Sequence, residues 1–150
     1  MCDNPNTTKL DALDRMRQMI TASGWAVQGV EGDRLHPPWA YTVGLTPEGA
    51  PELVISGKPL DECARVLNDT AAHALHAEPP VPGERIPLVG GPLVEIVGVP
   101  HPDAHLETAV ALYGAQVRAL QLVWADDRGH WPWDAGFRGR QRLFGPRVSR

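Results

Sequence analysis

Residues 39–56 read WAYTVGLTPEGAPELVIS, and this stretch decides the fold. Residues 39–45 alternate, so that one side of a strand would carry the larger side chains Trp39, Tyr41, Val43 and Leu45. Residues 52–56 form a second run of strand type, and residues 46–50 join the two through a proline and a glycine. Strands with so short a connection pair antiparallel. We therefore predict a β-hairpin at the centre of the fold.

Helical periodicity appears on both sides of this hairpin. A first helix is predicted from the capping-box spacing of Thr8 and Asp11 to a stop at Gly24, with Leu10, Leu13, Met16 and Ile20 on its apolar stripe. A second helix is predicted over residues 60–76, and its stripe is Leu60, Cys63, Ala64, Leu67, Ala71, Ala74 and Leu75. A short helix over residues 106–113 would end at Gly114.

The remaining apolar runs predict further strands. These cover residues 25–30, 85–88, 92–99, 117–124 and 130–133, with Gly90-Gly91 and the sequence Asp126-Asp127-Arg128-Gly129 as turns. Hairpins mixed with helices favour an α+β fold over a parallel doubly wound sheet. We expect a mostly antiparallel sheet of about six to seven strands with two longer helices and one short helix.

The length of 150 residues fits one domain that needs no disulfide or metal. We assign residues 1–134 to this domain and expect residues 1–8 to be mobile. Residues 135–150 contain five arginines and no acid. This composition is typical of a solvated tail, or of an arm that docks on an acidic partner or on a second copy of the chain, which would give a homodimer.

Composition also limits the partners and the location. The net charge of −4 argues against nucleic acid as the main partner, because phosphate binding needs a basic surface. Cys2 and Cys63 form neither a disulfide framework nor a ligand set, which indicates a reducing compartment. The sequence shows no secretory signal and no apolar run of the ~20 residues that a membrane span requires. The expectation is a cytoplasmic protein without a membrane partner.

Two polar residues interrupt predicted strands. Glu52 opens a strand, where it would act as a general acid/base, anchor neighbouring groups, or serve as an edge-strand charge that blocks sheet pairing. Gln121 lies among Leu120, Leu122 and Val123, so its amide must find partners inside the protein. It would organise a pocket or tie a loop to the sheet, and we favour the tie.

Residues 124–134, WADDRGHWPWD, hold three tryptophans beside carboxylates. They would form an aromatic-walled ligand site in which Asp126 or Asp134 orients the ligand. Alternatively, the indoles cap the core and Asp126 forms the turn through its side chain.

Signals for metals, cofactors and nucleophiles are weak. His73 and His76 could share one face of a helix, but Glu62 lies too far away to complete a metal site with them. His101 and His105 bracket Pro102, which spoils the helical geometry that an i, i+4 metal pair needs. Ser56-Gly57 lacks the flanking glycine of a nucleophile elbow, and no phosphate-binding glycine loop is found. We expect no metal and no cofactor.

Several of these segments resemble one bacterial family, domain of unknown function 4262. The resemblance covers about Leu10 to Asp134, and it is carried by Ser23-Gly24-Trp25, the stretch PWAYTVGL at residues 38–45, Pro51-Glu52-Leu53-Val54, Gln121-Leu122-Val123-Trp124, Asp126 and Trp131-Pro132-Trp133-Asp134. It implies a fold and a set of positions but no activity. In architecture the chain is also distantly similar to suppressor-of-fused-like domains, whose bacterial members include immunity proteins, and this similarity implies protein binding.

Our leading hypothesis is a non-catalytic module that binds a protein or a small molecule. Its site would form where Tyr41, Thr42, Glu52, Gln121, Trp124, Asp126, Trp131, Trp133 and Asp134 converge. The competing hypothesis is a small enzyme that uses Glu52 with Asp126 or His130 for acid/base chemistry, which requires one shared cleft and a raised pKa. A third is an accessory protein of a natural-product pathway, because the arginine-, alanine- and proline-rich composition is typical of high-GC bacteria.

Overall fold

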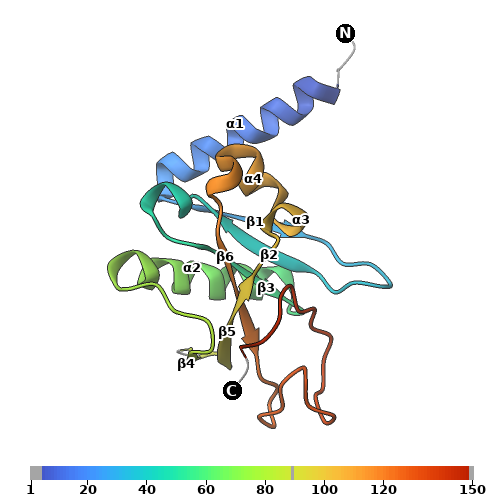
Figure 1. The fold of residues 1–150 in the computed structure, drawn as a ribbon. Helices are drawn as coiled ribbons and strands as arrows, with labels where there is room; N and C mark the ends of the chain where they lie inside the picture. Colours follow the sequence, from blue (N-terminus) through green and yellow to red (C-terminus); the bar gives the residue numbers. More distant parts are fainter. Residues whose placement is uncertain (1–4, 89, 149–150) are drawn as a thin grey trace.

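The computed structural model describes residues 5–88 and 90–148. The sheet and its flanking helices are shown in Figure 1. In chain order the elements are helix α1 (Pro5–Ser23), strands β1 (Ala26–Val30) and β2 (Trp39–Val43), the turn η1 (Thr46–Glu48), strand β3 (Glu52–Ser56), helix α2 (Leu60–His76), strands β4 (Arg85–Pro87) and β5 (Leu93–Val99), helices α3 (Pro102–His105) and α4 (Glu107–Tyr113), the turn η2 (Gly114–Gln116) and strand β6 (Ala119–Trp124). The fold is α+β, as the sequence predicts.

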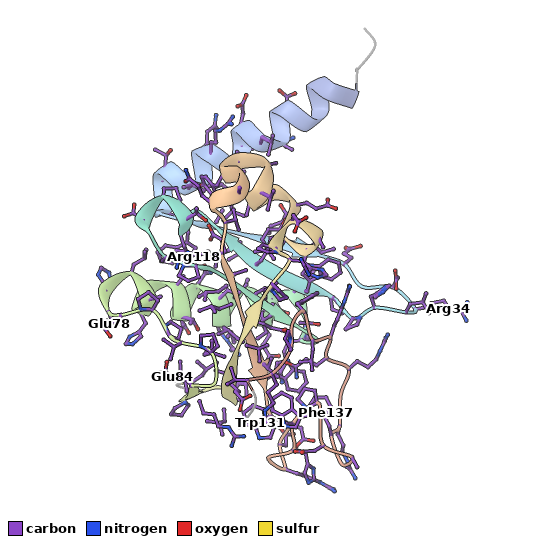
Figure 2. All side chains as sticks on the ribbon, in the orientation of Figure 1. Arg34, Glu78, Glu84, Arg118, Trp131 and Phe137 are labelled. Atoms are coloured by element: carbon purple, nitrogen blue, oxygen red, sulfur yellow. The ribbon has the colours of Figure 1, made fainter. Side chains whose placement is uncertain are left out.

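The six strands form one sheet in the order β1-β2-β3-β6-β5-β4. Neighbours are antiparallel except β3 and β6, which run parallel with Glu52 opposite Ala119. The starts of two parallel strands lie at the same end of a sheet, and their C-terminal ends lie at the other. Figure 2 shows this separation, because Arg118, just before β6, and Trp131, beyond its end, lie far apart along the strand direction.

Helix α2 covers one face of the sheet, and this face is apolar. Cys63, Leu67 and Ala71 of α2 are fully buried against side chains of the four strands β2, β3, β5 and β6: Ala40, Leu53, Ile55, Val94, Ile96, Leu120 and Leu122. Burial of one large aliphatic side chain such as Leu67 contributes about 1.5–3 kcal/mol. The helical stripe of α2 therefore holds this face through the hydrophobic effect.

The opposite face has a composite cover. Helices α1 and α4 lie together at one end of the molecule (Figure 1), where Met16 and Ile20 share an apolar cluster with Leu106 and Ala109. Phe144, from the C-terminal segment, belongs to the same cluster and is 5% exposed. We call residues 139–148 the C-terminal strap, because they run over this face.

The prediction of a solvated tail is wrong for these residues. The backbone N–H of Phe144 donates a 2.8 Å hydrogen bond to Oε1 of Gln121, which is fully buried. The arginines misled the sequence interpretation, because their charged groups reach the surface while the backbone between them packs on the sheet. Docking of this segment on a second copy stays a prediction.

Other boundaries differ locally from the prediction. Helix α1 begins at Pro5, three residues before the start predicted at Thr8. Residues 130–133 form no strand, because the backbone of this segment turns again at Asp134 rather than pairing with β6. Part of the expected mobile start, residues 1–4 with Cys2, lies outside the described residues.

Candidate functional site

Glu52 is an anchoring carboxylate in the interior of the protein. Its Oε1 accepts hydrogen bonds from Thr42 Oγ1 at 2.9 Å and from Leu45 N at 3.2 Å. Its Oε2 accepts bonds from Thr46 N at 2.8 Å, Thr46 Oγ1 at 2.6 Å and Gly44 N at 3.3 Å. These donors occupy the roughly four lone-pair positions of a carboxylate. Glu52 therefore holds the turn after β2 together.

The edge-strand interpretation of Glu52 is wrong. Strand β3 lies between β2 and β6 and has no free edge. The Glu52 side chain is 0% exposed, so it blocks no pairing with another sheet. Thr42, the second predicted residue here, links the same network to β3, because its Oγ1 accepts a 2.9 Å hydrogen bond from Leu53 N.

Gln121 ties the C-terminal strap to the sheet, which is the interpretation that the sequence favoured. Its Nε2 donates to the carbonyl of Arg142 at 2.6 Å, and its Oε1 accepts from Phe144 N. Tyr41 lies in the same row of the sheet, two strands away, and its hydroxyl accepts a 3.0 Å hydrogen bond from Thr108 N. Burial raises the pKa of Tyr41, so the phenol stays neutral.

Asp126 builds the turn that follows β6. Its Oδ1 accepts hydrogen bonds from the backbone N–H of Arg128 and His130, at 2.9 and 2.8 Å, and its Oδ2 accepts one from Arg138 N at 2.8 Å. Burial would raise the pKa of Asp126, but these three backbone donors outweigh it and hold the pKa below its usual range. His130 Nδ1 lies 3.7 Å from Asp126 Oδ2 without a hydrogen-bond partner. Asp126 is thus ionised, and three of its roughly four acceptor positions are occupied by backbone N–H groups.

The tryptophans beyond this turn are packed between arginines. Trp131 and Trp133 stack with centroids 5.4 Å apart and an interplanar angle of 6°. Arg85 lies 4.6 Å over Trp131, and Arg147 lies 4.1 Å over Trp133. Such cation–π contacts contribute about 0.5–1 kcal/mol each at exposed sites. The remaining site candidate here, Asp134, closes the turn that carries both tryptophans, because its Oδ2 accepts a 2.8 Å hydrogen bond from Trp131 N.

Glu95 locks the two arginines of this stack, and the sequence analysis missed it. Its side chain is 1% exposed, with Oε1 at 3.1 Å from Arg85 Nε and Oε2 at 2.9 Å from Arg147 Nε. Burial raises the pKa of Glu95, but the hydrogen bonds and charges of Arg147 and Arg85 outweigh it and lower the pKa. The signal in the sequence was a single carboxylate inside the apolar run LVEIVGV of β5.

The predicted convergence of the site residues in one hollow is wrong. Glu52 starts β3 beside Ala119, whereas Asp126 and the tryptophan stack follow Trp124 at the other end of β6. Ala119 and Trp124 alone are about 16 Å apart at about 3.3 Å per residue. Glu52 and Asp126 therefore cannot serve one acid/base cleft. The parallel pairing of β3 with β6 causes this separation.

Two of the predicted residues do line a small pocket. It has a volume of about 220 Å³ and is lined by Trp124, Asp126, Lys58, Asp127, Arg128 and Arg138. Most of the Trp124 ring is unavailable, because this residue is 4% exposed, its Nε1 donates a 2.7 Å hydrogen bond to Ser56 O and Lys58 Nζ lies 4.0 Å over the ring. The pocket is small, and five of its six lining residues are charged.

A larger groove lies between α2 and β4 and contains none of the predicted site residues. Its volume is about 500 Å³, within the range of small-molecule and peptide sites. The apolar part is formed by Val66, Ala74, Ile86 and Leu88, and charged groups line the rest: Arg65, Asp69, Glu78 and Glu84, beside His73. Figure 2 shows Glu78 and Glu84 on the same side of the molecule, near the end of α2 and near β4.

A sequence signal for this groove exists but is weak. Val66, Thr70 and Ala74 recur every four residues on α2, along the edge of its apolar stripe, and the last two are small. They face the turn at Gly90-Gly91, which is also open because it lacks side chains. The sequence predicts the hairpin of β4 and β5 but not its contact with α2, which the structure shows because Ile86 and Leu88 pack against the core cluster that contains Val66.

Among residues 5–88 and 90–148, no group of three or more His, Cys, Asp or Glu side chains is arranged to hold a metal ion. No helix there has the length and hydrophobicity that a membrane crossing requires.

Comparison with known proteins assigns a family. Residues 19–138 match the family described as Domain of unknown function (DUF4262), which covers most of the chain. No curated protein and no solved structure matches. The distant similarity to suppressor-of-fused-like domains is not shown by these comparisons.

Proposed function

The chain belongs to the DUF4262 family, whose description names no activity, and from this premise we propose that it is a non-catalytic binding module with its ligand site in the groove between α2 and β4. A bacterial, cytoplasmic setting and a protein partner are part of the proposal. The observation that carries it is the groove itself, a concave surface of about 500 Å³ with an apolar floor and charged sides.

The charges of the groove define the ligand. Three carboxylates, Asp69, Glu78 and Glu84, face one guanidinium, Arg65. A complementary ligand carries an apolar side chain for Ile86 and Leu88 and a cationic group for the carboxylates. We therefore infer a short peptide segment of a partner protein that combines aliphatic and basic residues.

Side chains rather than strand addition would hold this peptide. Strand β4 is an edge of the sheet, but it is only three residues long and ends in Pro87, which has no backbone N–H to donate. A peptide bound here would gain little from main-chain pairing. Its affinity would come from burial in the groove between β4 and α2.

The state of the buried carboxylates supports binding over catalysis. A general acid at neutral pH needs a raised pKa and access to substrate. Glu95 and Asp126 have lowered pKa values, and Glu52 is enclosed by five hydrogen-bond donor contacts. The groove, in contrast, is open to a ligand.

Selection from a displayed library of random peptides tests the proposal. The immobilised wild-type chain is the target, and the variant Leu88→Glu, which places a charge on the apolar floor, is the counter-target. We expect the peptides that prefer the wild type to share an aliphatic residue next to Lys or Arg. In NMR spectra of the isotope-labelled chain, these peptides should shift the signals of residues in α2 and β4.

The matched control is Leu35→Glu, the same substitution at a side chain that is 82% exposed and lies outside the groove, between β1 and β2. It should bind the selected peptides as the wild type does. If no peptide distinguishes the wild type from Leu88→Glu, or if the bound peptides perturb another surface, the groove is not the ligand site.

A further inference from the structure

The C-terminal strap crosses three strands on the face opposite α2. At β3 the backbone of Gly57 approaches that of Arg140 so closely that a Cβ at Gly57 would collide with the Arg140 carbonyl oxygen. At β5 a Cβ on Gly145 would collide in the same way with the carbonyl oxygen of Gly98. The backbone of the strap thus packs directly on the backbone of the domain near both of its ends. We call the surface under the strap the track.

Buried polar side chains of the sheet bind the main chain of the strap. Ser56 Oγ accepts a 3.2 Å hydrogen bond from Arg142 N, and Gln121 binds both the carbonyl of Arg142 and the N–H of Phe144. Ser56 and Gln121 are both 0% exposed. Polar side chains that bond to the backbone of an extended segment are a general means of peptide recognition, because they do not depend on the peptide side chains.

Three side chains of the strap add specificity. Gln141 accepts a 2.9 Å hydrogen bond from Trp124 N and donates a 3.0 Å hydrogen bond to Trp124 O. Phe144 is enclosed by aromatic rings, with its centroid 5.9 Å from Trp39 and 4.6 Å from His105. Arg147 bonds to Glu95 at 2.9 Å and lies over Trp133. The track therefore has one aromatic and one cationic position, which are three residues apart along the strap.

The family match ends where the strap begins. The matched region covers residues 19–138, and the strap starts at Gly139. Ser56, Glu95 and Gln121 lie within the matched domain, whereas the strap that binds all three lies outside it. Glu95 also binds Arg85, inside the domain. The matched domain thus supplies the binding surface, and the strap that binds to this surface is a separate segment of the chain.

We propose that this face is a peptide-binding site, filled in the monomer by the chain's own strap, and that its second occupant is the strap of another copy. The fit identifies the occupant, since an exchanged strap repeats the contacts of the closed monomer. Gly136 and Gly139 bracket the connection that would have to open. The strap carries three arginines and no acid in a chain of net charge −4, which favours its approach to another copy. This inference is independent of the groove.

A labelled peptide tests the site with the full chain. The peptide has the strap sequence GRQRLFGPRV and is titrated into the wild type and into the double variant Phe144→Ala/Arg147→Ala, whose own strap is weakened. Apparent affinity scales with the fraction of open sites. We expect the double variant to bind the peptide about tenfold more tightly than the wild type, or better.

Three controls define the outcome. A peptide in which the residues that correspond to Phe144 and Arg147 are replaced by Ala should not bind. A scrambled peptide should not bind, and adding Gln121→Ala to the double variant should abolish binding of the strap peptide. If the folded double variant binds the strap peptide no better than the wild type, or binds the scrambled peptide equally well, the proposal is overturned.

Strap exchange between two copies is measured separately. Two differently tagged wild-type chains, refolded together from denaturant at high concentration, should co-purify as a dimer, and the same pair carrying Gln121→Ala should not. A dimer that forms equally with Gln121→Ala, or a chain that stays monomeric at every concentration, contradicts exchange. If the double variant does not fold, Arg147→Gln alone weakens the strap and takes its place in the peptide titration.

Discussion

The two faces of the sheet are covered by different physical means. Helix α2 meets its face with an apolar stripe, and Leu67 is buried among Leu53, Ile55 and Ile96 without polar contacts of its side chain. The strap meets the opposite face with backbone groups that bind Ser56 and Gln121 and with Arg147 bound to Glu95. The first cover belongs to the hydrophobic core. The second is a specific docking of one segment, so it should open without unfolding the rest.

The largest loss of global stability is expected from a substitution on the α2 face. Leu67→Ala leaves a cavity at a site that is 0% exposed, and substitutions of this type cost about 2–5 kcal/mol. Because α2 contacts several strands, the loss should appear in global unfolding by denaturant, with one transition. An unchanged midpoint for Leu67→Ala would show that α2 is not integral to the fold.

A different kind of effect is expected at Gln121. Gln121→Ala leaves the carbonyl of Arg142 and the N–H of Phe144 without their partner, at about 1–3 kcal/mol for each group that stays buried. Because the strap can detach and let water reach these groups, global stability should fall by less than in Leu67→Ala. Hydrogen exchange and tryptic cleavage at Arg142 should increase strongly. Loss of global stability without greater exchange in the strap would contradict separate opening.

Sequence reasoning predicted the α2 face far better than the strap face. The stripe of α2 and the hairpin of β2 and β3 follow from local rules, the i, i+4 spacing and a short turn, and both are confirmed. No local rule of this kind predicts where the strap packs. Its residues, with Arg, Gln, Gly and Pro prominent, have the composition of a solvated tail, and its partners Ser56 and Gln121 lie far away in the sequence.

The candidate site depended on strand order, which local patterns do not contain. Gln121 and Glu52 were correctly singled out as polar residues that need internal partners. Their placement could not be derived, because nothing in the sequence requires β3 and β6 to pair in parallel. That pairing separates Glu52 from Asp126, whereas an antiparallel pair would have brought the start of β3 next to the end of β6.

The stability of the strap should depend on pH more than the stability of the α2 face does, and this effect should be smaller than that of Gln121→Ala. The pKa of Glu95 is lowered from 4.5 in the folded protein, so its contribution to stability is complete above the unfolded-state value and is lost as the pH falls through the folded-state pKa. Its partners Arg85 and Arg147 have side chains that are 37% and 36% exposed, which limits the effect by solvent screening.

We therefore expect the strap to open on acidification below about pH 4.5 before the α2 face unfolds. Hydrogen exchange of strap residues between pH 3 and pH 6 is the measurement. In Glu95→Gln, which cannot ionise, the strap should be loosened at neutral pH and should lose most of this pH dependence. A wild-type strap equally protected at pH 3 and pH 6 would rule out a role for the Glu95 charge.

The smallest effect is expected at Trp133, and it bears on how the indoles are used. Trp133→Leu keeps an apolar side chain but removes the stack on Trp131 and the contact with Arg147, each of which contributes about 0.5–1 kcal/mol. Leu143→Ala, at a strap residue that is 39% exposed, is the matched control and should change stability by less than about 0.5 kcal/mol. Two measurements compare the variants: the thermal unfolding midpoint, and the hydrogen exchange of strap residues in the folded protein. If Trp133→Leu is as neutral as Leu143→Ala, the indole does not hold the strap, and Trp133 becomes available again as a ligand-binding residue.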